Sequence, residues 1–113
     1  MSDTKLQGFF CKAANGRQCY EIDQVTSEFI YVAANYLTQR YGFSAPKKPI
    51  VGFDEVITEC SKEDLKLLLG WDNWSGFYVM ADAPETDALV KEFGEYLDSI
   101  IQQPEFEIYL HIW

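Results

Sequence analysis

The sequence predicts an α+β fold, a single two-layer domain in which a mainly antiparallel sheet carries two helices. Two segments have apolar residues at three- and four-residue spacing, which is typical of amphipathic helices. The other apolar segments are short, and connections of a few residues join them, which favours antiparallel strands. The predicted order is ββαβββαβ. With 113 residues, 48% of them hydrophobic, the chain has the size and apolar content of one domain, residues 1–113.

Residues 5–22 predict a β-hairpin around Asn15 and Gly16, a dipeptide that favours tight turns between strands. A three-residue loop at 14–16 would place Cys11 opposite Cys19. A helix over residues 3–14 is the alternative, but it would hold Gly8 in its interior at a cost of about 1 kcal/mol relative to Ala.

Helical periodicity begins after Thr26 and Ser27, either of which can cap a helix, and Gly42 ends it. The basic, proline-containing segment 44–49 then predicts an exposed loop. A second helix begins with a capping box formed by Asp82 and Glu85 and ends before Pro104. Its apolar stripe consists of Leu89, Val90, Phe93, Tyr96, Leu97, Ile100 and Ile101.

Residues 50–60, 64–71 and 76–81 predict three consecutive strands of a meander. In the second of them Leu65, Leu67, Leu69 and Trp71 share one face. The last segment, residues 105–113, alternates almost perfectly and predicts a strand with one exposed face. Its predicted buried residues are Phe106, Ile108, Leu110 and Ile112, and its predicted exposed residues are Glu105, Glu107, Tyr109, His111 and Trp113.

Acidic residues are concentrated in the second half of the chain. Residues 1–50 hold 6 basic and 4 acidic side chains, whereas residues 51–113 hold 3 basic and 14 acidic ones, within a net charge of −9. Such a surface repels a phosphate backbone, so we expect no binding to nucleic acid and a preference for cationic partners. Solubility alone is an equally good explanation of this charge. The longest apolar run, residues 29–34, is too short for a membrane span, and we expect a cytoplasmic location.

Few residues suit catalysis or metal binding. Three cysteines without an export signal favour reduced thiols packed as small apolar groups, and zinc would need four clustered ligands, so we predict no structural metal and no cofactor. There is no glycine-rich phosphate loop. Glu105, Glu107 and His111 share a predicted strand face and are the one candidate set for acid–base chemistry. A solvated strand face explains them better, so we predict that the protein is not an enzyme.

Residues 70–81, GWDNWSGFYVMA, are the most distinctive segment. Trp71 continues the face of Leu65, Leu67 and Leu69, and we assign it to the core. Trp74 lies in the predicted turn, where it either seals the core or forms a binding hot spot.

A small acidic α+β chain with a GWDxWSG-like turn, a GFYVMA-like strand and an acidic helix, here over residues 65–101, resembles bacterial immunity proteins of contact-dependent growth inhibition and related polymorphic toxin systems. The resemblance implies a cytosolic inhibitor of the toxin domain delivered by a neighbouring cell, often a nuclease. It transfers no individual binding residue.

We therefore expect a monomeric, non-enzymatic protein that binds one basic toxin domain and blocks its active site or substrate groove. The candidate partner-binding residues are Asp72, Asn73, Trp74, Asp82, Glu85, Asp87, Glu105 and Glu107. The alternative is an adaptor or homodimeric module that pairs through the last strand and buries Tyr109 and Trp113.

Overall fold

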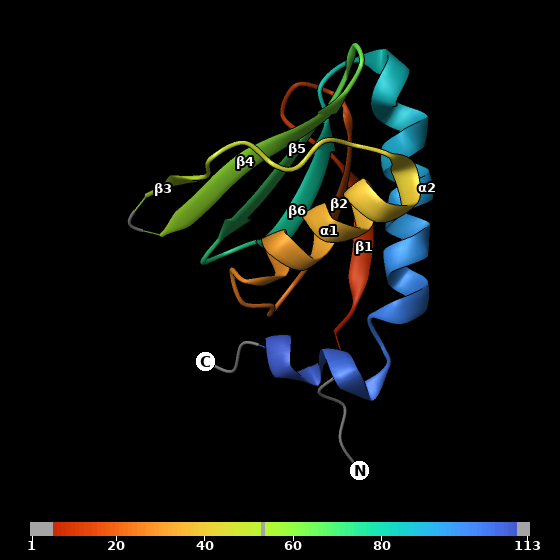
Figure 1. Cartoon of the computed structure of the whole chain (residues 1–113). Coiled ribbons are helices and arrows are strands. Elements are labelled where there is room, and N and C mark those ends of the chain that lie inside the picture. Colours follow the sequence, from red (N-terminus) through yellow and green to blue (C-terminus); the bar gives the residue numbers. More distant parts are fainter. Residues whose placement is uncertain (1–5, 53, 111–113) are drawn as a thin grey trace.

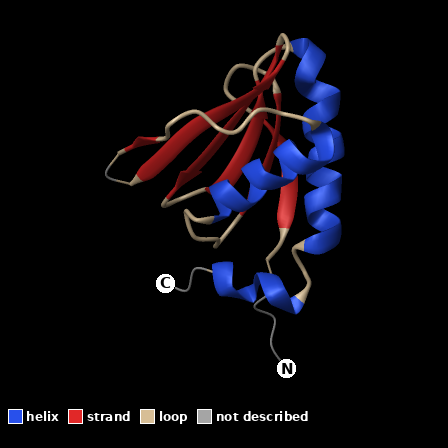
Figure 2. Cartoon of the chain, in the orientation of Figure 1, coloured by secondary structure: helices blue, strands red, loops and turns tan. Residues whose placement is uncertain are grey.

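A six-stranded antiparallel sheet with two helices packed on one face forms the domain (Figure 1; Figure 2). The computed structural model describes residues 6–52 and 54–110. Its strand order is β1-β2-β6-β5-β4-β3, so α1 connects β2 in one half of the sheet to β3 at the far edge. The elements are β1 (Gly8–Lys12), β2 (Gln18–Ile22), α1 (Phe29–Tyr41), β3 (Ile50–Val51), β4 (Glu55–Lys62), β5 (Leu65–Asp72), β6 (Gly76–Ala81), α2 (Pro84–Ile100) and the 3-10 helix η1 (Pro104–Tyr109).

The predicted hairpin is confirmed. Cys11 pairs with Cys19 across β1 and β2, and the Ala13 N–H donates to the Arg17 carbonyl at 2.9 Å to close the loop. Gly16 has a φ of 82°, a left-handed conformation that glycine adopts without steric cost. Both thiols are free.

The first helix is confirmed, but its predicted cap is wrong. Helix α1 ends at Gly42, whose φ is 77° and whose N–H donates to the Leu37 carbonyl. At the other end neither Thr26 nor Ser27 acts as a side-chain cap. The residue before the helix is Glu28, which is itself in helical conformation and makes no side-chain cap hydrogen bond. The main-chain carbonyl of Thr26 accepts from the Phe29 N–H at 3.1 Å instead.

The segments predicted as three consecutive strands form the predicted antiparallel meander, β4-β5-β6. The first of them, residues 50–60, is divided between β3 and β4. The fully buried side chains of β5 and β6 lie on the face that the helices cover, and they are Leu67, Leu69, Phe77, Val79 and Ala81. Trp71 is partly buried at the end of this face, and its indole N–H donates to the Val25 carbonyl at 2.6 Å. The assignment of Trp71 to the core region is therefore confirmed.

Helix α2 has the predicted stripe, but a different cap. Val90, Phe93 and Leu97 are fully buried. The helix begins at Pro84 after an extended Ala83, so the predicted pairing of Asp82 with Glu85 is wrong. The Thr86 hydroxyl occupies that role, since it accepts from the Ala83 N–H at 3.3 Å and donates to the Ala83 carbonyl at 2.9 Å. In the described part of the chain, neither α1 nor α2 has the length and apolarity that crossing a membrane requires.

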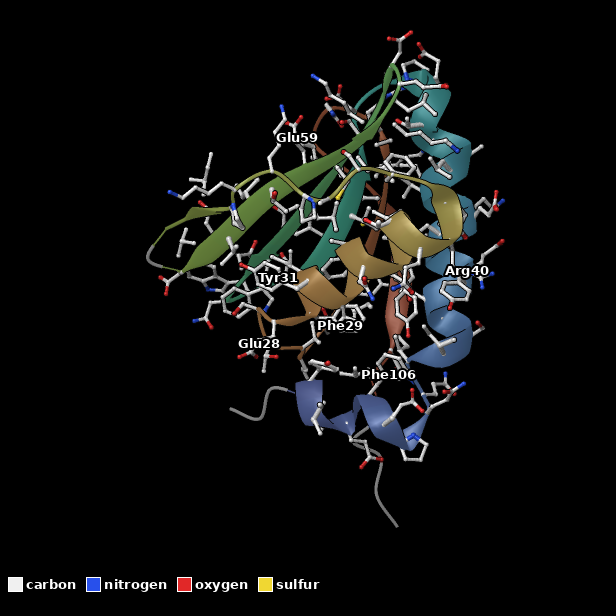
Figure 3. All side chains as sticks on the ribbon, viewed as in Figure 1. Glu28, Phe29, Tyr31, Arg40, Glu59 and Phe106 are labelled. Carbon is white, nitrogen blue, oxygen red and sulfur yellow. The ribbon has the colours of Figure 1, made fainter. Side chains whose placement is uncertain are left out.

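The predicted last strand is wrong over residues 104–109, which form η1. Pro104 has no N–H for a ladder and suits a first helical turn. In a helix with three residues per turn, Phe106 and Tyr109 lie on the same side. Their rings lie 6.5 and 5.7 Å from the Phe29 ring (Figure 3), while Ile108 is 77% exposed.

Among the described residues of the predicted strand, 105–110, only Leu110 forms a bridge, with Val25. His111, Ile112 and Trp113 lie outside the described residues.

The assignment of the sheet faces predicts unequal effects of two adjacent substitutions. Leu69→Ala should lower the free energy of unfolding by about 2–5 kcal/mol, because it opens a cavity under the helices. Leu68→Ala, on the opposite face, should lower it by about 1 kcal/mol, because Leu68 is only partly buried. Urea denaturation measures both changes, and equal losses would contradict the assignment.

Candidate protein-binding surface

The face of the sheet opposite the helices presents a mixture of apolar and acidic side chains, and we call it the outer face. Side chains alternate between the two faces of a strand, so the neighbours of each buried core residue in β2, β4, β5 and β6 point to the outer face. Its central residues are Cys19, Glu21, Glu55, Ile57, Glu59, Leu68, Gly70, Asp72, Tyr78 and Met80. The two helices and the core cluster account for the other face, and among the described residues no helix packs on the outer face.

Carboxylates gather at one end of the outer face. Glu55 of β4 is directly opposite Asp72 of β5, and Asp54 precedes Glu55. Glu21 of β2 belongs to the same neighbourhood, because burial and then the charges of Asp23 and Asp72 raise the pKa of its carboxyl group. Asp54, Glu55 and Asp72 therefore lie together, and the Glu21 carboxylate is near enough to Asp72 for the two charges to interact.

A tyrosine covers the centre of this acidic end. Tyr78 is the cross-strand partner of Gly70, and a Cβ atom at Gly70 would lie 2.2 Å from Cζ of Tyr78. The missing side chain of Gly70 therefore lets the phenol ring lie flat on the sheet. Burial, followed by the charges of Asp72 and Glu55, raises the pKa of Tyr78, which keeps the phenol neutral beside the carboxylates.

Trp74 projects from the turn that ends this region. Its side chain is 79% exposed, so the core-sealing interpretation of Trp74 is wrong. The turn beneath it is well defined, since Oδ1 of Asp72 accepts from the N–H groups of Trp74 at 2.9 Å and Ser75 at 2.5 Å. The Asn73 N–H donates to the Asp54 carbonyl at 3.1 Å and ties the turn to the start of β4.

These groups form one surface, which we call the acidic patch: Glu21, Asp54, Glu55, Asp72, Trp74 and Tyr78. Asp54, Glu55, Asp72 and Trp74 line a hollow of about 290 Å³ at its rim. A large exposed indole beside carboxylates and an open hollow are features of an interface anchor, and an indole contributes much apolar area on binding. The patch can therefore recognise a cationic surface that has an apolar cavity for the indole.

The structure separates the predicted partner-binding residues into three places. Asp72, Asn73 and Trp74 lie together at the acidic patch. Asp82 and Glu85 are exposed at the opposite end of β6, whose six residues span about 20 Å. The predicted set is therefore divided, because the length of β6 separates Asp82 and Glu85 from Asp72, Asn73 and Trp74.

Asp87 holds the hairpin against α2. Its carboxylate accepts from the Arg17 guanidinium at 3.1 Å and from the Gln18 N–H at 2.9 Å. Both oxygens are thus engaged within the fold, which favours a structural role for Asp87 over a role in partner binding.

Glu105 and Glu107 are exposed on η1 and do not share a strand face. Residues three apart share a side of a 3-10 helix, so residues two apart diverge. The predicted set of Glu105, Glu107 and His111 therefore loses its common strand, and His111 itself lies outside the described residues.

Four members of the acidic patch were missed as binding residues, namely Glu21, Asp54, Glu55 and Tyr78, although the register contains the signal for Glu55. Counting outward from the β4–β5 turn, where Lys62 faces Leu65, places Glu55 opposite Asp72. Glu21 comes from a distant part of the sequence and joins the patch only because β2 pairs with β6.

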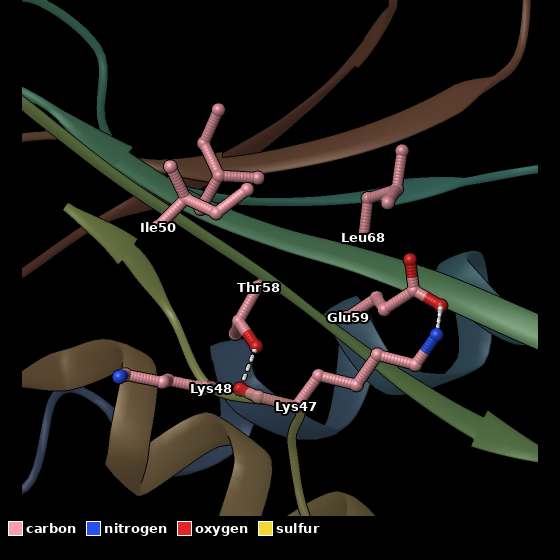
Figure 4. Close-up of a pocket in the computed structure, with 7 residues that line it drawn as sticks. Lys47, Lys48, Ile50, Thr58, Glu59 and Leu68 are labelled. Carbon is pink, nitrogen blue, oxygen red and sulfur yellow. Dashed lines mark hydrogen bonds and ion pairs between the residues drawn. The ribbon is translucent and has the colours of Figure 1, made fainter. Parts of the chain in front are cut away.

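A second hollow, of about 120 Å³, lies where the basic segment 44–49 crosses β4 (Figure 4). The Thr58 hydroxyl donates to the Lys47 carbonyl at 2.5 Å, and Nζ of Lys47 lies 3.0 Å from Oε2 of Glu59. The Lys47 N–H also donates to the Glu59 carbonyl, so this segment covers the edge of β4. These contacts attach the segment 44–49 to β4, so the residues that line the hollow have a role in the fold.

Comparisons with protein-family models, with curated proteins and with solved structures find no match to this chain. The functional argument therefore depends on the surface itself.

The contacts of Asp87 predict a loss of stability on its replacement. Asp87→Ala should lower the free energy of unfolding by about 1–2 kcal/mol, because it leaves the Gln18 N–H and Arg17 without their acceptor. Glu85→Ala, at an exposed position two residues away in the same first turn of α2, is the control and should change it by about 0.5 kcal/mol. Thermal or urea unfolding compares the two, and equal stability of both variants would contradict the structural role.

Proposed function

We propose that the protein is a non-enzymatic inhibitor of the immunity-protein class, which binds a cationic toxin domain and blocks its active site or substrate groove. The observation that carries the proposal is Trp74, an exposed indole on a well-ordered turn among Asp54, Glu55 and Asp72. The resemblance of residues 65–101 to bacterial immunity proteins supports the same class of partner.

The charge of the acidic patch suits a nuclease or another enzyme of anionic substrates. Such an enzyme presents a cationic groove to phosphate groups, and an array of carboxylates can occupy the same groove. Long-range attraction between opposite charges also accelerates the encounter of the two proteins. Inhibition by occlusion then needs no catalytic residue on the inhibitor.

The size of the domain is adequate for this mode of binding. Its accessible surface is 6636 Å². A standard interface covers about 800 Å² of each partner, which is about one eighth of this surface. The acidic patch and the adjoining apolar side chains of the outer face can form the centre of such an interface.

The alternative, a module that dimerises through a C-terminal edge strand, loses the element on which it depends. Residues 104–109 form η1, whose rings pack on Phe29 inside the same chain. We therefore retain the inhibitor proposal alone, with the protein acting as a monomer against its toxin.

Removal of the indole tests the proposed anchor. Trp74→Ala should weaken binding to the product of the neighbouring gene, tested as the candidate toxin, by about 30-fold or more, the loss typical of a hot-spot residue. Calorimetry measures the affinity. Thermal stability should stay unchanged, because the Trp74 side chain is exposed. Ile108→Ala, an exposed apolar residue on η1, is the control, and equal affinity of both variants would exclude Trp74 as the anchor.

Charge reversal tests the steering. Glu55→Lys should slow association with the same toxin domain by about tenfold at low salt and reduce the dependence of the rate on salt. Glu92→Lys makes the same change of charge at an exposed position on α2, away from the outer face, and should have the smaller effect. Stopped-flow measurements at several salt concentrations compare them. Identical effects would show that only net charge matters and would remove the acidic patch from the proposal.

A further inference from the structure

Two cysteines and a glutamate meet on the outer face of the hairpin. Cys11 and Cys19 are direct cross-strand partners, and Glu21 follows Cys19 by two residues on the same face. The two Sγ atoms and a carboxylate oxygen of Glu21 all lie within 4.8 Å of one another. The Cys11 thiol donates to Oε2 of Glu21 at 3.6 Å. Three residues with ligand-forming side chains are thus held together by one strand pair.

We propose that Cys11, Cys19 and Glu21 form a binding site for a thiophilic divalent cation such as zinc, with a fourth coordination position open to solvent or to an external ligand. The proposal is independent of the proposed inhibitor function. It rests on the position of three suitable donors and on the partial exposure of two of them, Cys11 and Glu21.

The spacing of the donors suits a tetrahedral ion. Zinc binds thiolate sulfur at about 2.3 Å and carboxylate oxygen at about 2.1 Å, so neighbouring donors around it lie about 3.6–3.8 Å apart. The sulfur–oxygen distance of 3.6 Å already has this value, and the upper limit of 4.8 Å leaves about 1 Å of side-chain adjustment. Because the backbone ladder sets the positions of all three residues, little reorganisation is needed on binding.

The surroundings attract a cation and admit it. Cys11 and Glu21 are partly exposed, whereas Cys19 is buried beneath them. Asp23 and Asp72 act on Glu21, so the local field is negative.

Such a site has no recognisable sequence spacing. The expectation of no structural metal was based on the absence of four clustered ligands, and a three-donor site across a hairpin is of another kind. The sheet has its own ladder and core, so the ion would be accessory to the fold. Cys60 is buried in the core cluster on the helix-covered face and provides an internal control.

The test is a titration of the whole protein, reduced with a non-thiol phosphine, with Zn²⁺ in a calorimeter and with Co²⁺ in a spectrophotometer. We expect one equivalent of metal, with sulfur-to-cobalt charge-transfer absorption and the visible bands of tetrahedral cobalt. Cys11→Ser should weaken binding by about 100-fold or more, since it removes a direct ligand, and Glu21→Gln by about tenfold. Cys60→Ala should bind like the unmodified protein.

Three results would overturn the proposal: no charge-transfer absorption at one equivalent, binding that survives Cys11→Ser and Glu21→Gln, or binding that is lost in a folded Cys60→Ala variant. Both substitutions at the site are at partly exposed positions, so folding of the variants, checked by circular dichroism, keeps the test decisive. Cys19→Ser adds to it only where that variant folds, because Cys19 is buried.

Discussion

The burial of one face of β5 and β6 beneath α1 and α2 is the constraint on which the rest of the structure depends. Leu67, Leu69, Phe77 and Val79 have no exposed surface, and full burial of such a side chain stabilises the fold by about 1.5–3 kcal/mol. A slip of one residue in register would turn all of them toward solvent. The core therefore also determines which residues lie on the outer face, because alternate residues of each strand point to opposite faces.

The acidic patch and the cysteine pair are both consequences of this arrangement. The acidic patch is not formed by a continuous segment of the sequence, since β2 pairs with β6 and brings Glu21 beside Tyr78, which follows it by about half the chain. The cysteine pair and Glu21, in contrast, lie within the β1–β2 hairpin. Glu21 contributes to both features. If both proposals hold, a cation bound by Cys11, Cys19 and Glu21 reduces the negative field of the acidic patch. Binding of the cation and binding of the cationic toxin domain then weaken each other.

The C-terminal segment shows how tertiary packing overrides a local pattern. Residues 105–113 alternate as a strand would, yet Phe106 and Tyr109 both reach Phe29, which requires a three-residue repeat. Phe29 also packs against Phe77 of β6 at 5.2 Å, so η1 covers the end of the existing core. Alternation alone does not distinguish a strand from a 3-10 helix here, because Phe29, the aromatic residue that decides between them, lies on α1.

Local chemistry in the sequence determined the hairpin with its Asn15–Gly16 loop, the end of α1 at Gly42, and the apolar faces of β5 and α2. In these places the conformational preferences of a few neighbouring residues are sufficient. Only the tertiary structure decided that Trp74 is exposed, that Asp87 is engaged by Arg17 and that Glu21 lies beside Tyr78. These outcomes depend on pairing between strands and helices far apart in the chain, and the free energy of that pairing is not contained in any local segment.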